Sequence, residues 1–109
     1  MDEGIIYSIV IPFHNEELSV EELLSALTRV MKLLKEPYEV IAIDDRSIDA
    51  TYEKLRKFAA SDPAIVPVLL PVRKGQTGAL AEGFSRSRGR ITISMDGDLQ
   101  DDPLDIPIL

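Results

Sequence analysis

The chain has 109 residues, of which 45% are hydrophobic and 28% are charged, which is the composition of a single globular domain. It contains no cysteine and only one histidine, which excludes disulfide bonds, thiolate metal sites and histidine-rich metal centres. Twelve lysine and arginine residues against 19 aspartate and glutamate residues give a net charge of −7, so the chain is not expected to bind nucleic acid nonspecifically.

The first two predicted elements are a strand and a helix. Residues 5–11 form an apolar, β-branched run before Pro12, which is typical of a buried parallel strand. Ser19 and Glu22 have the spacing of a capping box. Leucine, valine and methionine then recur at helical spacing, which predicts a helix that ends before Pro37.

The remaining elements continue the alternation. Residues 38–43 predict a second strand, which is followed by a helix capped by Asp49. Residues 65–72 predict a third strand, whose two prolines suit the edge of a sheet because they lack backbone donors. Residues 77–87 predict a helix, in which two glycines indicate close packing or a nearby ligand. Residues 90–95 predict a fourth strand.

This order predicts an α/β fold with a Rossmann-like parallel sheet of about four strands and helices on both faces. Ligands of such sheets bind beyond the carboxyl ends of the strands. Polar clusters follow all four predicted strands, at residues 12–16, 44–49, 73–77 and 96–102. Their convergence on one edge indicates a single binding site.

The sharpest cluster begins with Asp96, Gly97 and Asp98. Two carboxylates this close repel each other unless a cation lies between them, and Mg²⁺ and Mn²⁺ favour such oxygen ligands. Gln100 adds a neutral oxygen, and Gly97 leaves room for a ligand to approach the backbone. The Asp-x-Asp motif therefore predicts a divalent cation that holds a diphosphate. The alternative is a solvated acidic turn before Pro103.

Two further clusters suggest nucleotide contacts. Asp44 ends the second strand and is suited to accept a hydrogen bond from a base or a ribose. The alternative for this cluster is helix capping by Asp45, Ser47 and Asp49, for which one acid would suffice, so the additional Asp44 favours a ligand. Arg73 and Lys74 precede a helix and suit a phosphate, although they also fit solvated surface charge. For His14, the sequence favours an exposed loop residue over a catalytic residue.

Four blocks of sequence together resemble the family 2 glycosyltransferases of the GT-A fold. The blocks are residues 9–17, 44–51, 75–77 and 95–103, and their order and spacing match over nearly the whole chain. The last two are most similar to the branch that glycosylates polyprenyl phosphates, which includes dolichol-phosphate mannosyltransferases and bactoprenol glucosyltransferases.

This resemblance implies an inverting transfer of a hexose from a UDP- or GDP-hexose, assisted by Mg²⁺ or Mn²⁺. Asp98 is then the catalytic residue, because its metal neutralises the leaving diphosphate. The site residues implied by the resemblance are Pro12, Asn15 and Glu16 in the nucleotide pocket, Asp44 on the base or ribose, Asp96 by the ribose and the metal, and Asp98 with Gln100 on the metal.

The chain also departs from the family pattern. Arg46 stands where the family usually has glycine after the paired aspartates. The family's catalytic domain is about twice as long, so residues 1–109 are expected to form one donor-binding subdomain of a longer enzyme. Alone, this subdomain is expected to bind donor without transferring sugar, and its exposed apolar surface favours a homo-oligomer.

Location follows from the same considerations. The sequence has no signal peptide and no apolar run of the roughly 20 residues that a membrane span needs. A cytoplasmic chain is expected, and the parent enzyme is expected to meet its polyprenyl phosphate at the cytoplasmic face of a membrane.

Other classes of protein also combine a parallel sheet with paired acids. A receiver domain needs an aspartate after the third strand, where residues 69–71 are Leu-Leu-Pro. A phosphatase with an Asp-x-Asp nucleophile has it after the first strand, whereas here it follows the fourth. A non-catalytic nucleotide-binding module stays open as an alternative.

Overall fold

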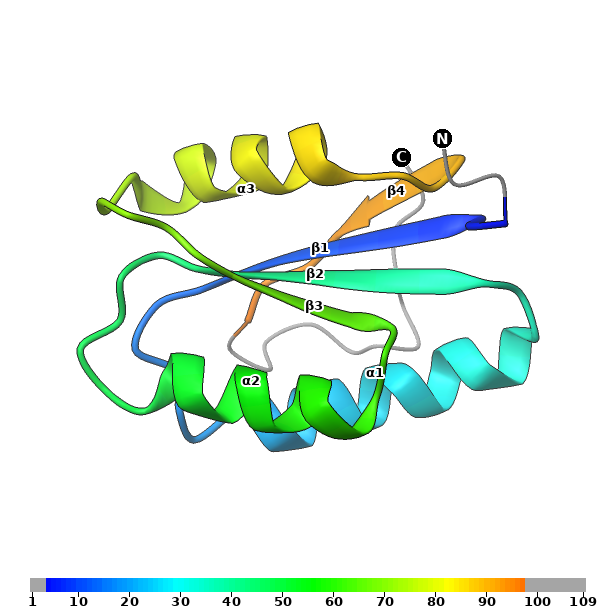
Figure 1. The fold of residues 1–109 in the computed structure, drawn as a ribbon, viewed down its shortest axis with the longest axis horizontal. Coiled ribbons are helices and arrows are strands. Elements are labelled where there is room, and N and C mark those ends of the chain that lie inside the picture. Colours follow the sequence, from blue (N-terminus) through cyan, green and yellow to red (C-terminus); the bar gives the residue numbers. More distant parts are fainter. Residues whose placement is uncertain (1–3, 98–109) are drawn as a thin grey trace.

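The computed structural model describes residues 4–97 (Figure 1). Strands and helices alternate throughout these residues, as the sequence predicts. In chain order they are β1 (Tyr7–Phe13), α1 (Val20–Leu34), β2 (Tyr38–Asp44), α2 (Thr51–Ser61), β3 (Ile65–Leu69), α3 (Gly75–Arg86) and β4 (Ile91–Ser94).

The strands form one parallel sheet in the order β3-β2-β1-β4. This confirms the predicted parallel sheet and the edge position of β3. Leu70 N donates a hydrogen bond to Asp44 O, so the backbone N–H and C=O groups of the even-numbered residues at this end of β3 point toward β2. Pro67 belongs to the odd-numbered set, and its missing N–H therefore falls on the open edge.

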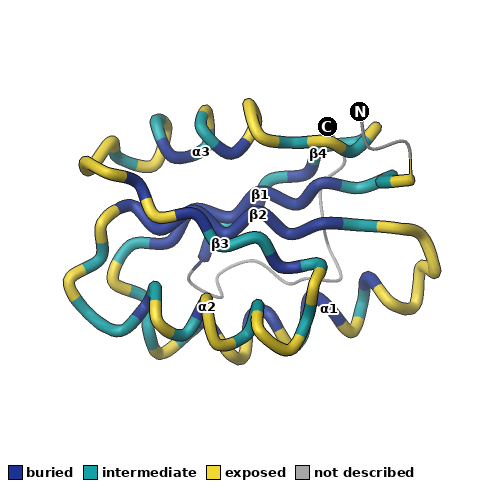
Figure 2. The backbone as a smooth tube through the Cα atoms, viewed as in Figure 1, coloured by how far each residue is buried: buried dark blue, intermediate teal, exposed yellow. Residues whose placement is uncertain are grey.

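Helices cover both faces of the sheet (Figure 1), which confirms the predicted layers. Residues Ile9 and Ile11 of β1 belong to a core that includes α1 and α2, whereas Val10 packs with α3 in a second core. The alternation of a strand's side chains thus supplies both cores. Figure 2 shows that buried residues gather along the strands in the middle of the molecule. Gly83 of α3 lies so close to β1 that a Cβ there would overlap Val10 Cγ1, so close packing explains this glycine.

Strand β1 continues to Phe13, and the expectation that it stops at Pro12 is wrong. Val10 O accepts a hydrogen bond from Met95 N, at 3.1 Å, so the even-numbered backbone groups of β1 face β4. Strand β4 ends at Ser94, opposite Val10. Because Pro12 lies beyond that end, its lack of an N–H interrupts no hydrogen bond between strands.

The helix starts show different capping. Ser19 is the N-cap of α1 as expected, but its side chain makes no capping hydrogen bond, so the predicted capping box is wrong in this respect. The N-cap of α2 is Ala50, so the prediction that Asp49 caps this helix is wrong. Asp49 lies one residue earlier, and its Oδ1 accepts hydrogen bonds from Thr51 N at 2.9 Å and from Thr51 Oγ1 at 2.5 Å. Burial acts to raise the pKa of Asp49, but the hydrogen bonds from Thr51 and Glu17 outweigh it and the pKa is lowered.

Helix α3 starts at Gly75, two residues before its expected first residue. No helix within residues 4–97 combines the length and the apolar character that crossing a bilayer requires.

Candidate functional site

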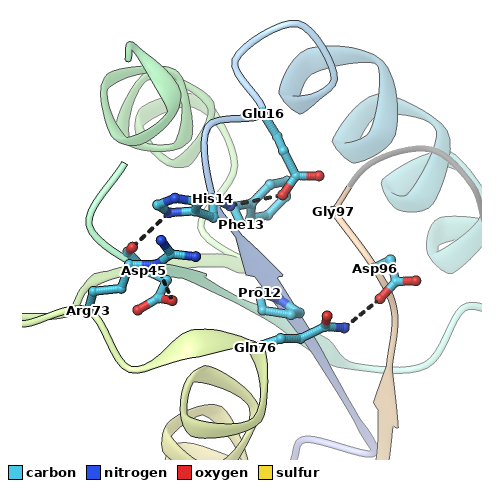
Figure 3. A pocket seen from close by; sticks show the side chains of 9 residues that line it. All are labelled: Pro12, Phe13, His14, Glu16, Asp45, Arg73, Gln76, Asp96 and Gly97. Atoms are coloured by element: carbon cyan, nitrogen blue, oxygen red, sulfur yellow. Dashed lines mark hydrogen bonds and ion pairs between the residues drawn. The ribbon is translucent and has the colours of Figure 1, made fainter. Parts of the chain in front are cut away.

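A pocket of about 300 Å³ opens at the carboxyl edge of the sheet (Figure 3). Its walls come from the ends of β1, β2 and β4 and from the start of α3. The residues that line the described part of it are Pro12, Phe13, His14, Glu16, Asp45, Arg73, Gln76, Asp96 and Gly97. All four predicted polar clusters thus contribute lining residues to one pocket, and the second contributes Asp45 alone.

Asp45 connects the pocket to the start of α3. Its carboxylate accepts hydrogen bonds from Lys74 N at 2.7 Å and from Gly75 N at 2.8 Å, and it forms an ion pair with Arg73 Nε at 3.5 Å. The side chain of Asp45 is only 4% exposed, whereas that of Arg73 is 60% exposed. A buried carboxylate therefore anchors the helix start, and Arg73 keeps its guanidinium at the mouth of the pocket.

On the opposite wall, Asp96 follows β4 and its Oδ1 accepts a hydrogen bond from Gln76 Nε2 at 2.9 Å. Gly97 packs directly on the end of β1. A Cβ at position 97 would lie 2.6 Å from Phe13 Cδ1 and 2.8 Å from Pro12 O. Close packing on the end of β1 therefore accounts for the glycine, which also lines the pocket.

The pocket is lined by more negative than positive charge. Glu16, Asp45 and Asp96 contribute carboxylates, and Arg73 contributes the guanidinium. Glu16 Oε1 accepts a hydrogen bond from His14 N at 2.8 Å, which turns this carboxylate toward the pocket (Figure 3). Hard oxygen donors in excess over cations suit a divalent ion that carries a negatively charged ligand.

The structure brings four of the predicted site residues together, because Pro12, Glu16, Arg73 and Asp96 all line the pocket. Asn15 lies outside this lining, and its side chain points toward the loop after β2. Its Oδ1 accepts a hydrogen bond from Ile48 N at 2.8 Å. Asn15 has a φ of 53°, a left-handed conformation that asparagine tolerates.

Asp44 also lies outside the described lining of the pocket. It is fully buried, and its carboxylate accepts hydrogen bonds from Ser47 Oγ and from Ser47 N. Burial raises the pKa of Asp44 above its ordinary value, although the hydrogen bonds from Ser47 oppose this shift. The observed contacts of Asp44 are thus with the turn that follows β2.

The predicted metal ligands lie mainly beyond the described residues. Asp98 and Gln100 fall outside residues 4–97, and Asp96 falls inside. Within the described range, no three acidic or histidine side chains converge in a way that would hold a metal ion.

The pocket residues that the sequence did not single out for binding include Asp45, His14 and Gln76. The alternation of side chains along β2 contains the signal for Asp45. Asp44 shares a face with Ala42, toward α1 and α2, and Asp45 shares one with Ile43, toward α3. His14 is half-buried rather than an open loop residue, because its Nδ1 lies 2.9 Å from Asp45 O. That contact has no signature in the sequence.

Curated proteins of known activity resemble the chain over almost its full length. It is 43% identical over 105 residues to the undecaprenyl-phosphate 4-deoxy-4-formamido-L-arabinose transferase of Aeromonas hydrophila subsp. hydrophila, covering 95% of this chain and 32% of the relative. It is 40% identical over 106 residues to the dodecaprenyl-phosphate galacturonate synthase of Rhizobium johnstonii, covering 96% of this chain and 31% of the relative. The chain therefore spans about a third of the length of these relatives.

Solved structures share the fold. A mannosyltransferase from Pyrobaculum calidifontis in complex with GDP-Man and Mn²⁺ matches with a TM-score of 0.72 and 26% identity, over 84% of this chain and 27% of that one. The glucosyl-3-phosphoglycerate synthase of Mycobacterium tuberculosis, in complex with Mn²⁺, UDP and glucosyl-3-phosphoglycerate, matches with a TM-score of 0.70 and 26% identity, over 94% and 37%. These likenesses confirm the GT-A fold. The family model described as Glycosyl transferase family 2 matches residues 8–109, and the chain accordingly belongs to glycosyl transferase family 2.

Proposed function

We propose that this chain binds the donor in an enzyme that transfers a sugar from a nucleotide diphosphate to a polyprenyl phosphate, with inversion at the sugar. The observation that carries the proposal is the pocket at the carboxyl edge of the sheet, where Glu16, Asp45, Arg73 and Asp96 face one space. Family membership supports the same reaction class. The chain spans about a third of its curated relatives, so the transfer is proposed for the protein that contains it.

Within the pocket, Glu16 binds the nucleoside, and Arg73 binds the diphosphate. A carboxylate accepts hydrogen bonds from base and ribose donors, while a guanidinium binds phosphate oxygens through two parallel hydrogen bonds. Asp45 is a positioning residue, because its buried carboxylate already accepts hydrogen bonds from Lys74 N and Gly75 N and pairs with Arg73. Asp44, which the sequence suggested for the base or ribose, accepts its hydrogen bonds from Ser47 of its own turn.

A divalent cation fits the oxygen-rich, negatively charged pocket, and Asp96 would hold it together with Asp98 and Gln100. When bound, the ion supplies Lewis-acid stabilisation of the leaving diphosphate. The protein's part is to orient that diphosphate between Arg73 and Asp96. A phosphate acceptor is already ionised, so a strong general base is of less importance. Two structural relatives bind Mn²⁺ with a GDP-sugar or with UDP, which supports this choice of ligands.

The acceptor and the sugar are proposed from the relatives. Both curated relatives are named for a polyprenyl phosphate, which supports a lipid phosphate acceptor met at the cytoplasmic face of a membrane. They are named for different sugars, a formamido-arabinose and a galacturonate. The hexose that the sequence suggested is therefore one candidate among several sugars.

Isothermal titration calorimetry tests the proposal. UDP, GDP and their sugar conjugates are titrated into the protein with Mn²⁺, with Mg²⁺ and with EDTA. We expect one nucleoside diphosphate to bind in the presence of metal and at least tenfold more weakly with EDTA. If none of them produces heat of binding with either metal, the proposed function is wrong.

A further inference from the structure

Two loops at the carboxyl edge of the sheet are joined by a chain of hydrogen bonds that runs through the single histidine. Ile48 N donates to Asn15 Oδ1 at 2.8 Å, Asn15 Nδ2 lies 3.1 Å from His14 Nε2, and His14 Nδ1 lies 2.9 Å from Asp45 O. Only His14 and Asp45 of these residues line the pocket. Asn15 therefore reaches the pocket only through its neighbours.

The partners in this chain fix where the protons lie. A backbone carbonyl only accepts, so the hydrogen bond to Asp45 O requires a proton on His14 Nδ1. Ile48 N–H only donates, so it turns the amide oxygen of Asn15 toward itself and the amide NH₂ toward His14. An NH₂ group only donates, so His14 Nε2 must be unprotonated. These contacts fit the imidazole tautomer that carries its proton on Nδ1.

This state depends on the orientation of one amide. The carboxylate of Asp44 interacts electrostatically with the ring, the carboxylate of Glu16 accepts a hydrogen bond from His14 N, and the cation in the described pocket lining is Arg73. The two carboxylates would attract an imidazolium. The Asn15 amide opposes protonation because a protonated Nε2 would point its hydrogen at the amide hydrogens of Asn15.

The fixed ring in turn holds Asp45. The Asp45 carbonyl accepts the His14 proton, and the Asp45 carboxylate accepts the backbone hydrogen bonds of Lys74 and Gly75. Arg73 precedes these two residues and pairs with the same carboxylate. Displacement of the Asp45 backbone would therefore move the residue that we assign to the diphosphate.

We propose that Asn15 is a positioning residue for the donor pocket: it holds His14 neutral with the proton on Nδ1, and His14 then fixes Asp45 and, through it, Arg73. The effect on the donor rests on the proposed function. The state of His14 does not, because it follows from the contacts alone.

The test uses nitrogen-15 NMR of the imidazole together with calorimetry. The chain has one histidine, so its two ring nitrogens need no further assignment. Asn15→Asp is the informative variant, because aspartate has the same shape, tolerates the left-handed backbone at φ 53° and cannot donate to Nε2. Leu18→Asp is the matched control, since it adds the same charge to the same loop on a side chain that is 90% exposed.

At pH 7.5 we expect the unchanged protein and Leu18→Asp to show a protonated Nδ1 and a bare Nε2. Asn15→Asp should show both nitrogens protonated, together with shifted amide signals at Lys74 and Gly75. Its affinity for the nucleoside diphosphate should fall by about five- to tenfold, because the hydrogen bond that holds the Asp45 backbone in place is weakened.

Other results overturn the proposal. A proton on Nε2 in the unchanged protein, or an unaltered imidazole spectrum in Asn15→Asp, would mean that Asn15 does not set the state of the ring. If Asn15→Asp does not fold, His14→Asn and His14→Phe replace it: only asparagine retains a donor near the Asp45 carbonyl, so equal affinity in the two variants contradicts the positioning role. If no nucleotide binds the unchanged protein, the proposed function fails, and the imidazole spectra still decide whether Asn15 controls His14.

Discussion

Gly97 and Phe13 lie in direct contact, so that a Cβ at position 97 would stand 2.6 Å from Phe13 Cδ1. Real side chains do not approach this closely, and Phe13 is fully buried and unable to move aside freely. The contact fixes the backbone just after Asp96. The aspartate that we assign to the metal is therefore positioned by packing against β1.

Gly97→Ala is expected to destabilise the protein by about 1–3 kcal/mol, because the added methyl group overpacks the contact with Phe13. It should also weaken metal-dependent nucleotide binding, since Asp96 moves with its neighbour. Urea unfolding and calorimetry measure the two effects. Gly4→Ala is the control, because nothing lies within 4 Å of a Cβ at position 4. Equal stability of the two variants would contradict the packing argument.

Arg73→Gln is expected to reduce affinity for a nucleoside diphosphate by about tenfold, through loss of a charge-assisted contact with the phosphates. Stability should change little, because the guanidinium is largely exposed and its ion pair with Asp45 is screened. Lys74→Gln is the matched control: the Lys74 side chain pairs with Glu82, and its backbone N–H to Asp45 is retained. A loss of affinity as large in Lys74→Gln as in Arg73→Gln would show that general positive charge is responsible.

Asp44→Asn is expected to gain stability relative to the unchanged protein as the pH rises from about 3.5 to 7. Burial raises the pKa of Asp44, so the folded state retains this proton at pH values where the unfolded chain has lost it. The contribution of Asp44 to stability therefore falls as the pH rises through this range, and asparagine removes that fall. Melting temperatures across the range measure the difference, and a difference that does not vary with pH would contradict it.

Glu39→Ala is expected to destabilise the fold by about 2–3 kcal/mol without changing nucleotide affinity. Glu39 is 2% exposed at the amino end of β2, where it accepts hydrogen bonds from Ser8 Oγ at 2.6 Å, Arg88 N at 2.8 Å and Arg88 Nε at 3.1 Å. Its loss leaves the Ser8 hydroxyl and two Arg88 donors without this acceptor. Because the pocket lies at the opposite end of the sheet, a large loss of affinity would argue against our placement of the donor.

The order of the elements was accessible from the sequence because each strand and helix carries its own periodicity and its own end signals. The ends of elements were less accessible where a partner element decides them. Strand β1 passes through Pro12 because β4 has already ended alongside it, and α3 starts at Gly75 because Asp45 of another loop accepts its first N–H groups. Both effects depend on residues distant in the chain.

The location of the site was accessible too, since parallel strands bring their carboxyl ends to one edge. The division of roles within it was not. Asn15 and Asp44 are polar residues in the right loops, but the Asn15 side chain contacts Ile48 N and His14, and the Asp44 carboxylate contacts Ser47. Loop conformation decides which polar side chain points into the pocket and which bonds to the surrounding loops. Neighbouring residues of the same type, such as Asp44 and Asp45, can therefore have different roles.

The most direct test of the account locates the donor site by NMR, using the paramagnetic broadening that Mn²⁺ causes in nearby signals. Stoichiometric Mn²⁺ is added to the isotopically labelled protein with the nucleoside diphosphate that calorimetry identifies. We predict that the amide signals of Gly97 and Gln76 broaden first, only with nucleotide present, while Gly89 at the amino end of the sheet is unaffected. Broadening that is centred on Gly89, or spread evenly over the acidic surface, would contradict a donor site at the carboxyl edge.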